Sequence, residues 1–139
     1  TDDAFIKEVA ESKGATVIDR PEHLTMDVVG KRDVLLHALD ETQHSTPGYI
    51  CLLQANSPQI KVEDIDAAIE KVVSSGGKLR DCCSMNRDTL ITDGAIRVFE
   101  SEVTFTQGPG MYQSCILTDY VDVHTKEDLD KIEEALGNV

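Results

Sequence analysis

Apolar positions recur at helical spacing in several stretches of the chain. The clearest is residues 62–74, where Val62, Ile65, Ile69 and Val72 return every three or four positions and a glycine pair follows. The same periodicity predicts an amphipathic helix that is capped by Thr1–Asp2–Asp3 and ends at Gly14. It predicts two further helices, over residues 31–42 and after Thr125.

Short apolar runs separate these helices and predict strands. They cover residues 15–18, 49–54, 79–85, 95–99, 112–117 and 120–123, with a turn at residues 92–94 and a loop at residues 108–110. Strands that alternate with helices predict an α/β layered domain with a mainly parallel sheet. The unbroken run Ile50–Cys51–Leu52–Leu53 predicts a central strand that is covered on both faces.

The strand over residues 49–54 ends abruptly in polar residues, in the sequence LLQANSP. Ligands of open α/β sheets bind outside the carboxyl ends of the strands, so Gln54, Asn56 and Ser57 are candidate binding residues. The alternative is an ordinary strand-to-loop turn whose polar groups satisfy their own backbone. The residue pattern leaves both interpretations open.

The net charge of −13 limits the classes of partner that the chain can bind. A nucleic-acid surface needs a basic face, so we expect none here, and a phosphorylated ligand would need a cation or a local basic cluster beside it. Within the sequence, no apolar run reaches the roughly 20 residues that span a bilayer. We therefore expect a cytoplasmic protein without a membrane partner, with residues 1–139 forming one domain.

The four cysteines, Cys51, Cys82, Cys83 and Cys115, form no C-x-x-C pair, and each lies in an apolar, strand-like run. The adjacent Cys82 and Cys83 would point to opposite faces of a strand, so they cannot hold one metal ion together. We expect all four to be buried, reduced packing residues, which fits a reducing compartment.

Five segments in order resemble one enzyme family, the acylneuraminate cytidylyltransferases, which make CMP-sialic acid and related CMP-sugars. LLQANSP with the helix that follows it resembles the family's LLQPTSP segment, and DGAIRVF resembles NGAIYVF. The segments TDDAFIKEVAESKGATV, RPEHLTMD and YVDVHTKEDLDKIEEAL resemble the family's STDD, RP-x-x-L-x-x-D and DIDT segments. The resemblance implies a three-layer α/β/α, nucleotide-diphospho-sugar-transferase-like (Rossmann-like) fold that is truncated at its N-terminus, a partial domain over residues 1–139.

The resemblance also implies a site. In this family the anomeric hydroxyl of a sugar acid attacks the α-phosphate of CTP and pyrophosphate leaves, with Mg²⁺ as counter-charge. Gln54 would contact the sugar acid, while Asn56 and Ser57 would shape the loop. Asp122 takes the place of the first metal-binding acid and His124 that of the second, although imidazole is a poor Mg²⁺ ligand. No catalytic side chain is implied. The alternative for residues 122–124 is a strand end before a capped helix.

Two departures from the family limit the expected activity. No Gly- and basic-rich loop resembling PARGGSKGIPGKN is present, and the segment between Leu79 and Gly94 is shorter than the family's. We therefore expect this chain to resemble the carboxyl-terminal part of a cytidylyltransferase and not to turn over by itself. The alternative is a non-catalytic module that binds a sugar, a nucleotide or a partner. We also expect a homodimer through an exposed sheet edge at residues 15–18, strengthened by salt.

Overall fold

The computed structural model describes residues 1–26, 28–42, 48–101 and 112–137. The chain divides into two compact units, Thr1–Thr46 and Pro47–Val139, which are considered one at a time. The loop predicted at residues 108–110 lies outside the described residues. Across the ranges described, no helix combines the length and the apolar character needed to cross a membrane.

The first unit contains helix α1 (Ala4–Ser12), the short 3-10 helix η1 (Glu22–Leu24) and helix α2 (Lys31–Glu41). Asp3 caps α1, because its carboxylate accepts a hydrogen bond of 2.8 Å from the backbone N–H of Ile6. After α1 the backbone of Gly14 is left-handed, with φ of 84°. Both predicted helices of this unit are confirmed.

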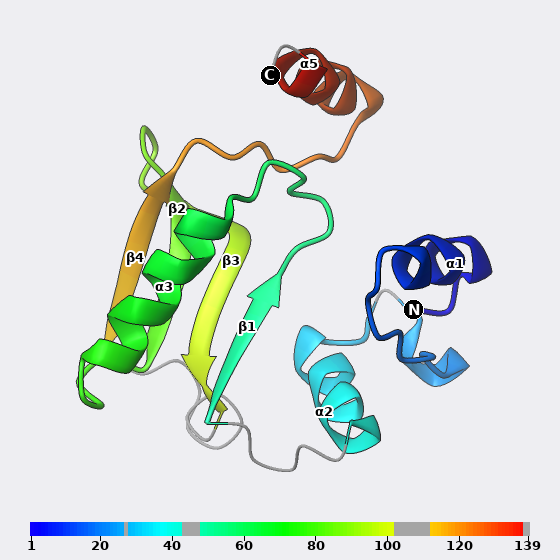
Figure 1. Cartoon of the computed structure of the whole chain (residues 1–139), viewed down its shortest axis with the longest axis horizontal. Helices are drawn as coiled ribbons and strands as arrows, with labels where there is room; N and C mark the ends of the chain where they lie inside the picture. The colour runs from blue at the N-terminus through cyan, green and yellow to red at the C-terminus, as the bar shows by residue number, and fades with distance from the viewer. Residues whose placement is uncertain (27, 43–47, 102–111, 138–139) are drawn as a thin grey trace. The chain divides into compact units, whose positions relative to one another are not determined.

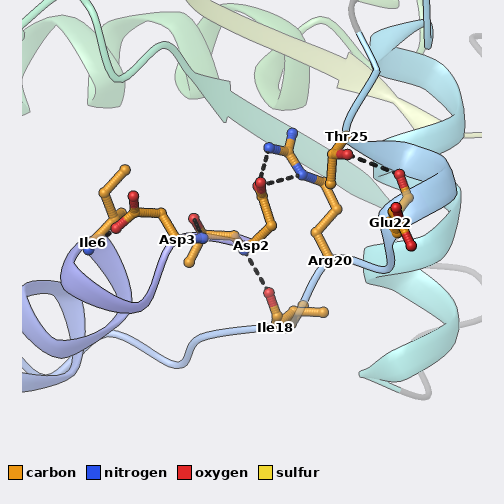
Figure 2. A network of polar contacts seen from close by, with 8 residues as sticks. Asp2, Asp3, Ile6, Ile18, Arg20, Glu22 and Thr25 are labelled. Atoms are coloured by element: carbon orange, nitrogen blue, oxygen red, sulfur yellow. Dashed lines mark hydrogen bonds and ion pairs between the residues drawn. The ribbon is translucent and has the colours of Figure 1, made fainter.

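The prediction of a strand at residues 15–18 is wrong, since these residues have no regular secondary structure. The backbone there makes no ladder: the Ile18 carbonyl oxygen accepts from the Thr1 nitrogen at 2.6 Å, and the Arg20 N–H donates to the Thr1 carbonyl oxygen at 2.9 Å. Figure 2 shows the Arg20 guanidinium turned toward Asp2. The predicted dimer contact at these residues therefore loses the strand on which it depended.

The second unit is a four-stranded sheet with helix α3 packed on one face (Figure 1). The strand order is β1-β3-β2-β4. The elements are β1 (Tyr49–Leu53), α3 (Val62–Ser74), β2 (Asp81–Asn86), β3 (Thr92–Glu100), β4 (Gln113–Thr118) and α5 (Lys126–Gly137). Helix α3 has the bounds that its periodicity predicts. The strand predicted at residues 120–123 is absent, since those residues have no regular secondary structure.

The α/β class is confirmed, but the prediction of a mainly parallel sheet is wrong. β3 runs antiparallel to both β1 and β2, and only β2 and β4 pair in parallel. The cause is a tight hairpin between β2 and β3, where the Asn86 side-chain oxygen accepts the backbone N–H groups of Asp88 and Thr89. Leu90 in this turn has φ of 56°. The remaining three strands, β1, β2 and β4, all point the same way.

β1 lies at an edge of the sheet, so the prediction of a doubly covered central strand is wrong. Among the described residues it pairs only with β3, with Cys51 opposite Val98. Tyr49 and Leu53 remain 43% and 45% exposed. An apolar run of four residues therefore marks a strand here without marking its burial.

The core lies between α3 and the sheet. Ala68 and Val72 of the helix pack on Cys82, Ile96 and Val98 of the strands, and all five are fully buried. Such burial contributes roughly 25 cal/mol per Å² of apolar surface. At the β4 side, the Lys71 ammonium donates to the Cys115 carbonyl oxygen at 2.7 Å, which fixes the helix laterally.

Residues 92–94 belong to β3 and do not form the predicted turn. Asp93 explains the difference, because its carboxylate accepts hydrogen bonds from the hydroxyls of Ser84 in β2 and Thr118 in β4. It also accepts the Ala95 N–H at 3.0 Å. One carboxylate thus joins three strands beside an irregularity in the β2–β3 register.

The cysteine prediction is only partly correct. All four thiols are free, and Cys82 is buried in the core. Cys83 and Cys115 are half-buried, whereas Cys51 is exposed because it lies on the edge strand.

Candidate functional site

The residues after β1 form a compact turn. Gln54 N–H extends the ladder to the Ala95 carbonyl oxygen at 3.0 Å, and Ser57 N–H donates back to the Gln54 carbonyl oxygen at 3.2 Å. Ser57 is only 3% exposed, while Gln54 and Asn56 are half-buried. The backbone of this turn is therefore held partly by the turn itself and partly by β3.

Asn56 is the member of this turn that reaches a distant segment. Its side-chain amide donates to the Asp122 carboxylate, and its backbone carbonyl oxygen accepts the Val123 N–H at 2.9 Å. β1 and β4 point the same way, so the segments that follow them leave the sheet at the same end, where they meet. The structure thus brings together two of the predicted site segments, residues 54–57 and 122–124.

His124 completes a surface chain of polar contacts. Its ring Nε2 lies 2.7 Å from the second carboxylate oxygen of Asp122. The side chains of Asp122 and His124 are 41% and 70% exposed, so both are open to a ligand. Directly beyond them, Thr125 and Asp128 cap α5 reciprocally, with Thr125 N–H donating to Asp128 at 3.0 Å and Asp128 N–H to Thr125 at 3.2 Å.

This donor set does not suit a tightly held Mg²⁺. Both oxygens of Asp122 already have partners, one on the Asn56 amide and one on the His124 ring. Mg²⁺ favours several hard oxygen ligands in octahedral geometry. Over the described ranges, no three His, Cys, Asp or Glu side chains gather where they could hold a metal ion. The metal role of Asp122 and His124 stays a prediction.

A hollow of about 260 Å³ lies beside these segments, and the sequence did not single it out. Tyr120 lies at its wall, 8% exposed, where its hydroxyl donates to Asp64 and accepts the Lys61 N–H at 2.9 Å. Burial, and then the hydrogen bond to Asp64, raises the pKa of Tyr120 to about 12. The tyrosine itself was the available signal, since a buried tyrosine hydroxyl needs a partner.

Gln59 was also missed. Its side-chain oxygen accepts the Val121 N–H at 3.1 Å, so it holds the Asp122 segment from the other side of the turn. The segment over residues 120–123 lacks a strand ladder, and side-chain and turn contacts from residues 56, 59 and 61 hold it instead. That explains why an apolar, strand-like sequence forms no strand there.

In the first unit, the two remaining N-terminal segments of the resemblance meet. Asp2 accepts two hydrogen bonds from the Arg20 guanidinium, and Lys7 pairs with Asp19 at 2.6 Å (Figure 2 shows the first pair). The Arg20 contact lowers the pKa of Asp2, and the Lys7 contact lowers the pKa of Asp19. These side chains line a hollow of about 440 Å³ that carries charges of both signs.

No protein-family model matches the chain, and a search of curated proteins finds no match. The family resemblance therefore rests on the five sequence segments alone.

Proposed function

We propose that this chain is a cytidylyltransferase-type protein whose second unit binds an acidic sugar such as an N-acylneuraminate. The observation that supports this proposal is the hydrogen bond between Asn56 and Asp122. These residues belong to two segments that independently resemble the sugar-acid and metal segments of the acylneuraminate cytidylyltransferases, and they meet at the carboxyl end of the parallel strands.

The polar groups at this end of the sheet suit a polyhydroxylated acid. The Gln54 and Asn56 amides can donate to a carboxylate and accept from hydroxyls, which one charged group alone cannot do. The exposed His124 ring adds a further hydrogen-bonding group beside them. In the family reaction, CMP passes from CTP to the sugar hydroxyl, and Mg²⁺ neutralises the phosphates. We assign no step of that reaction to a protein-held metal.

Direct binding tests the proposal. Isothermal titration with N-acetylneuraminate, and separately with CTP and Mg²⁺, is compared for the unmodified chain, Gln54→Ala and Asn56→Ala. Gln113→Ala is the matched control, because Gln113 is an exposed amide at the start of β4, at the other end of the strands. We expect about ten- to hundredfold weaker sugar binding in the two site variants and no change in the control, since a lost hydrogen bond to a charged group costs roughly 1.5–3 kcal/mol.

Pyrophosphate release separates the enzyme from the binding module. The chain has a net charge of −13 and no Gly- and basic-rich loop among its 139 residues to hold the triphosphate. We therefore expect the chain alone to bind the sugar without turning over CTP. Release that depends on both substrates would contradict that expectation and establish the enzyme. Absence of sugar binding would remove the proposed function altogether.

A further inference from the structure

The neighbouring parallel strands β2 and β4 place two thiols side by side. Cys83 and Cys115 are register partners in that ladder. Register partners project from the same face of a sheet, and Cys82, the next residue along, projects from the opposite face into the α3 core. Cys83 and Cys115 therefore share the face of the sheet that α3 does not cover. Both are free and half-buried, so a small oxidant can reach them.

The spacing of the strands suits a covalent bond between this pair. Adjacent strands lie roughly 4.7–4.9 Å apart, and disulfides join Cα atoms that are about 4.4–6.8 Å apart. The other two cysteines cannot compete for either partner. β1, which carries Cys51, is separated from β2 by the whole width of β3, and Cys82 points into the core.

We propose that Cys83 and Cys115 are a reversible oxidation site, which a peroxide closes to a cross-strand disulfide. The thiolate of one cysteine attacks the peroxide O–O bond, giving a sulfenic acid and one molecule of water or alcohol. The second thiol attacks that sulfur, the S–S bond forms, and water leaves. Two thiols are oxidised by two electrons in total, and the peroxide is reduced. A dithiol such as dithiothreitol reverses the reaction by exchange.

The surroundings of the pair set the reaction's pH dependence. Burial raises the pKa of the Cys83 thiol, and the neighbouring Asp81, Cys115 and Asp93 act in the same direction, while Arg97 acts against them. Because the thiolate is the attacking species, we expect oxidation that is slow near neutral pH and faster as the pH rises.

Peptide mapping after peroxide treatment tests the site. The full chain is oxidised at low concentration with hydrogen peroxide, its remaining thiols are alkylated, and a tryptic digest is analysed without reduction. We expect two of the four thiols to disappear, a cross-linked pair of peptides that contains Cys83 and Cys115, and recovery of all four thiols with dithiothreitol.

Three serine variants complete the experiment. Cys51→Ser removes the exposed thiol and should leave the cross-link unchanged, whereas Cys83→Ser and Cys115→Ser should each abolish it. The proposal is overturned if the Cys51→Ser chain keeps its three thiols after prolonged peroxide treatment. It is equally overturned if the cross-link joins other cysteines, or if Cys83 and Cys115 advance to sulfinic or sulfonic acids without pairing.

Discussion

Asn56 and Asp122 lie 66 positions apart in the chain and are joined by a hydrogen bond from the side-chain amide to the carboxylate. We expect this contact to couple the two residues energetically. In a double-mutant cycle with Asn56→Ala and Asp122→Ala, the coupling in the free energy of unfolding should be about 0.5–1 kcal/mol, a modest value because Asp122 is 41% exposed. Urea denaturation followed by circular dichroism measures it. Strictly additive variants would show that the contact contributes nothing in solution.

The hydroxyl of Tyr120 should contribute to the free energy of unfolding. Tyr120→Phe keeps the ring in the core but leaves Asp64 and the Lys61 N–H without their hydroxyl partner. We expect a loss of about 1–3 kcal/mol in the free energy of unfolding. The exposed Tyr112→Phe is the matched control and should change it by less than about 0.5 kcal/mol. Equal effects of the two substitutions would contradict the described hydrogen bonds.

The same tyrosine predicts a stability change at high pH. Its pKa rises from the ordinary 10.0 to about 12, mainly through burial, so the folded state favours the neutral phenol. That stabilisation is complete below pH 10 and is lost as the pH rises toward 12. The difference in unfolding free energy between the unmodified chain and Tyr120→Phe should therefore shrink over this interval. A difference that stays constant between about pH 8 and about pH 12 would contradict the raised pKa of Tyr120.

The ion pair between Asp81 and Arg97 should stabilise the β2–β3 pairing. The Asp81 side chain is 6% exposed and meets a guanidinium that is 35% exposed and lies over the Phe99 ring. We expect Asp81→Asn to cost about 1–3 kcal/mol, since a half-buried cation loses its partner. Asp119→Asn is the control, because its pair with Arg87 is exposed and should be worth less than about 0.5 kcal/mol. Thermal denaturation compares the two, and similar shifts would contradict the difference in burial.

The homodimer stays a prediction, although its expected contact at residues 15–18 has no strand. Among the described strands of the second unit, β1 presents an edge with exposed apolar side chains. We expect self-association that strengthens with salt, because salt screens the repulsion between two chains of charge −13. Size exclusion with light scattering at low and high salt measures it. A monomer under both conditions would contradict the prediction.

Local signals in the sequence predicted the helices well. The apolar period of residues 62–74 and the glycines after it gave α3 its bounds, and the Asp3 and Thr125 caps marked the starts of α1 and α5. These signals depend on neighbours within a few positions, which is why they can be read from the chain itself.

Pairing between distant strands was harder to predict. The sequence Thr92–Asp93–Gly94 resembles a turn more closely than the segment at Asn86, which forms the actual turn. Asp93 instead accepts hydrogen bonds from Ser84 and Thr118 and so joins three strands, which is a set of distant contacts that local patterns do not show. The meeting of residue 56 with residue 122 could in principle be predicted, since β1 and β4 point the same way. The roles of Gln59 and Tyr120 could not be, because they arise from contacts of a segment without regular structure.

The sheet order has a consequence for how the chain folds during synthesis. β2 and β3 are joined by a tight hairpin and can pair as soon as they are made, whereas Tyr49 of β1 has its register partner only at Glu100. The apolar run of β1 must therefore wait, unpaired, while the ribosome makes α3 and the hairpin. Translation arrested before β3 should leave a nascent chain that chaperones bind at β1, and release from them should begin once Glu100 has left the exit tunnel.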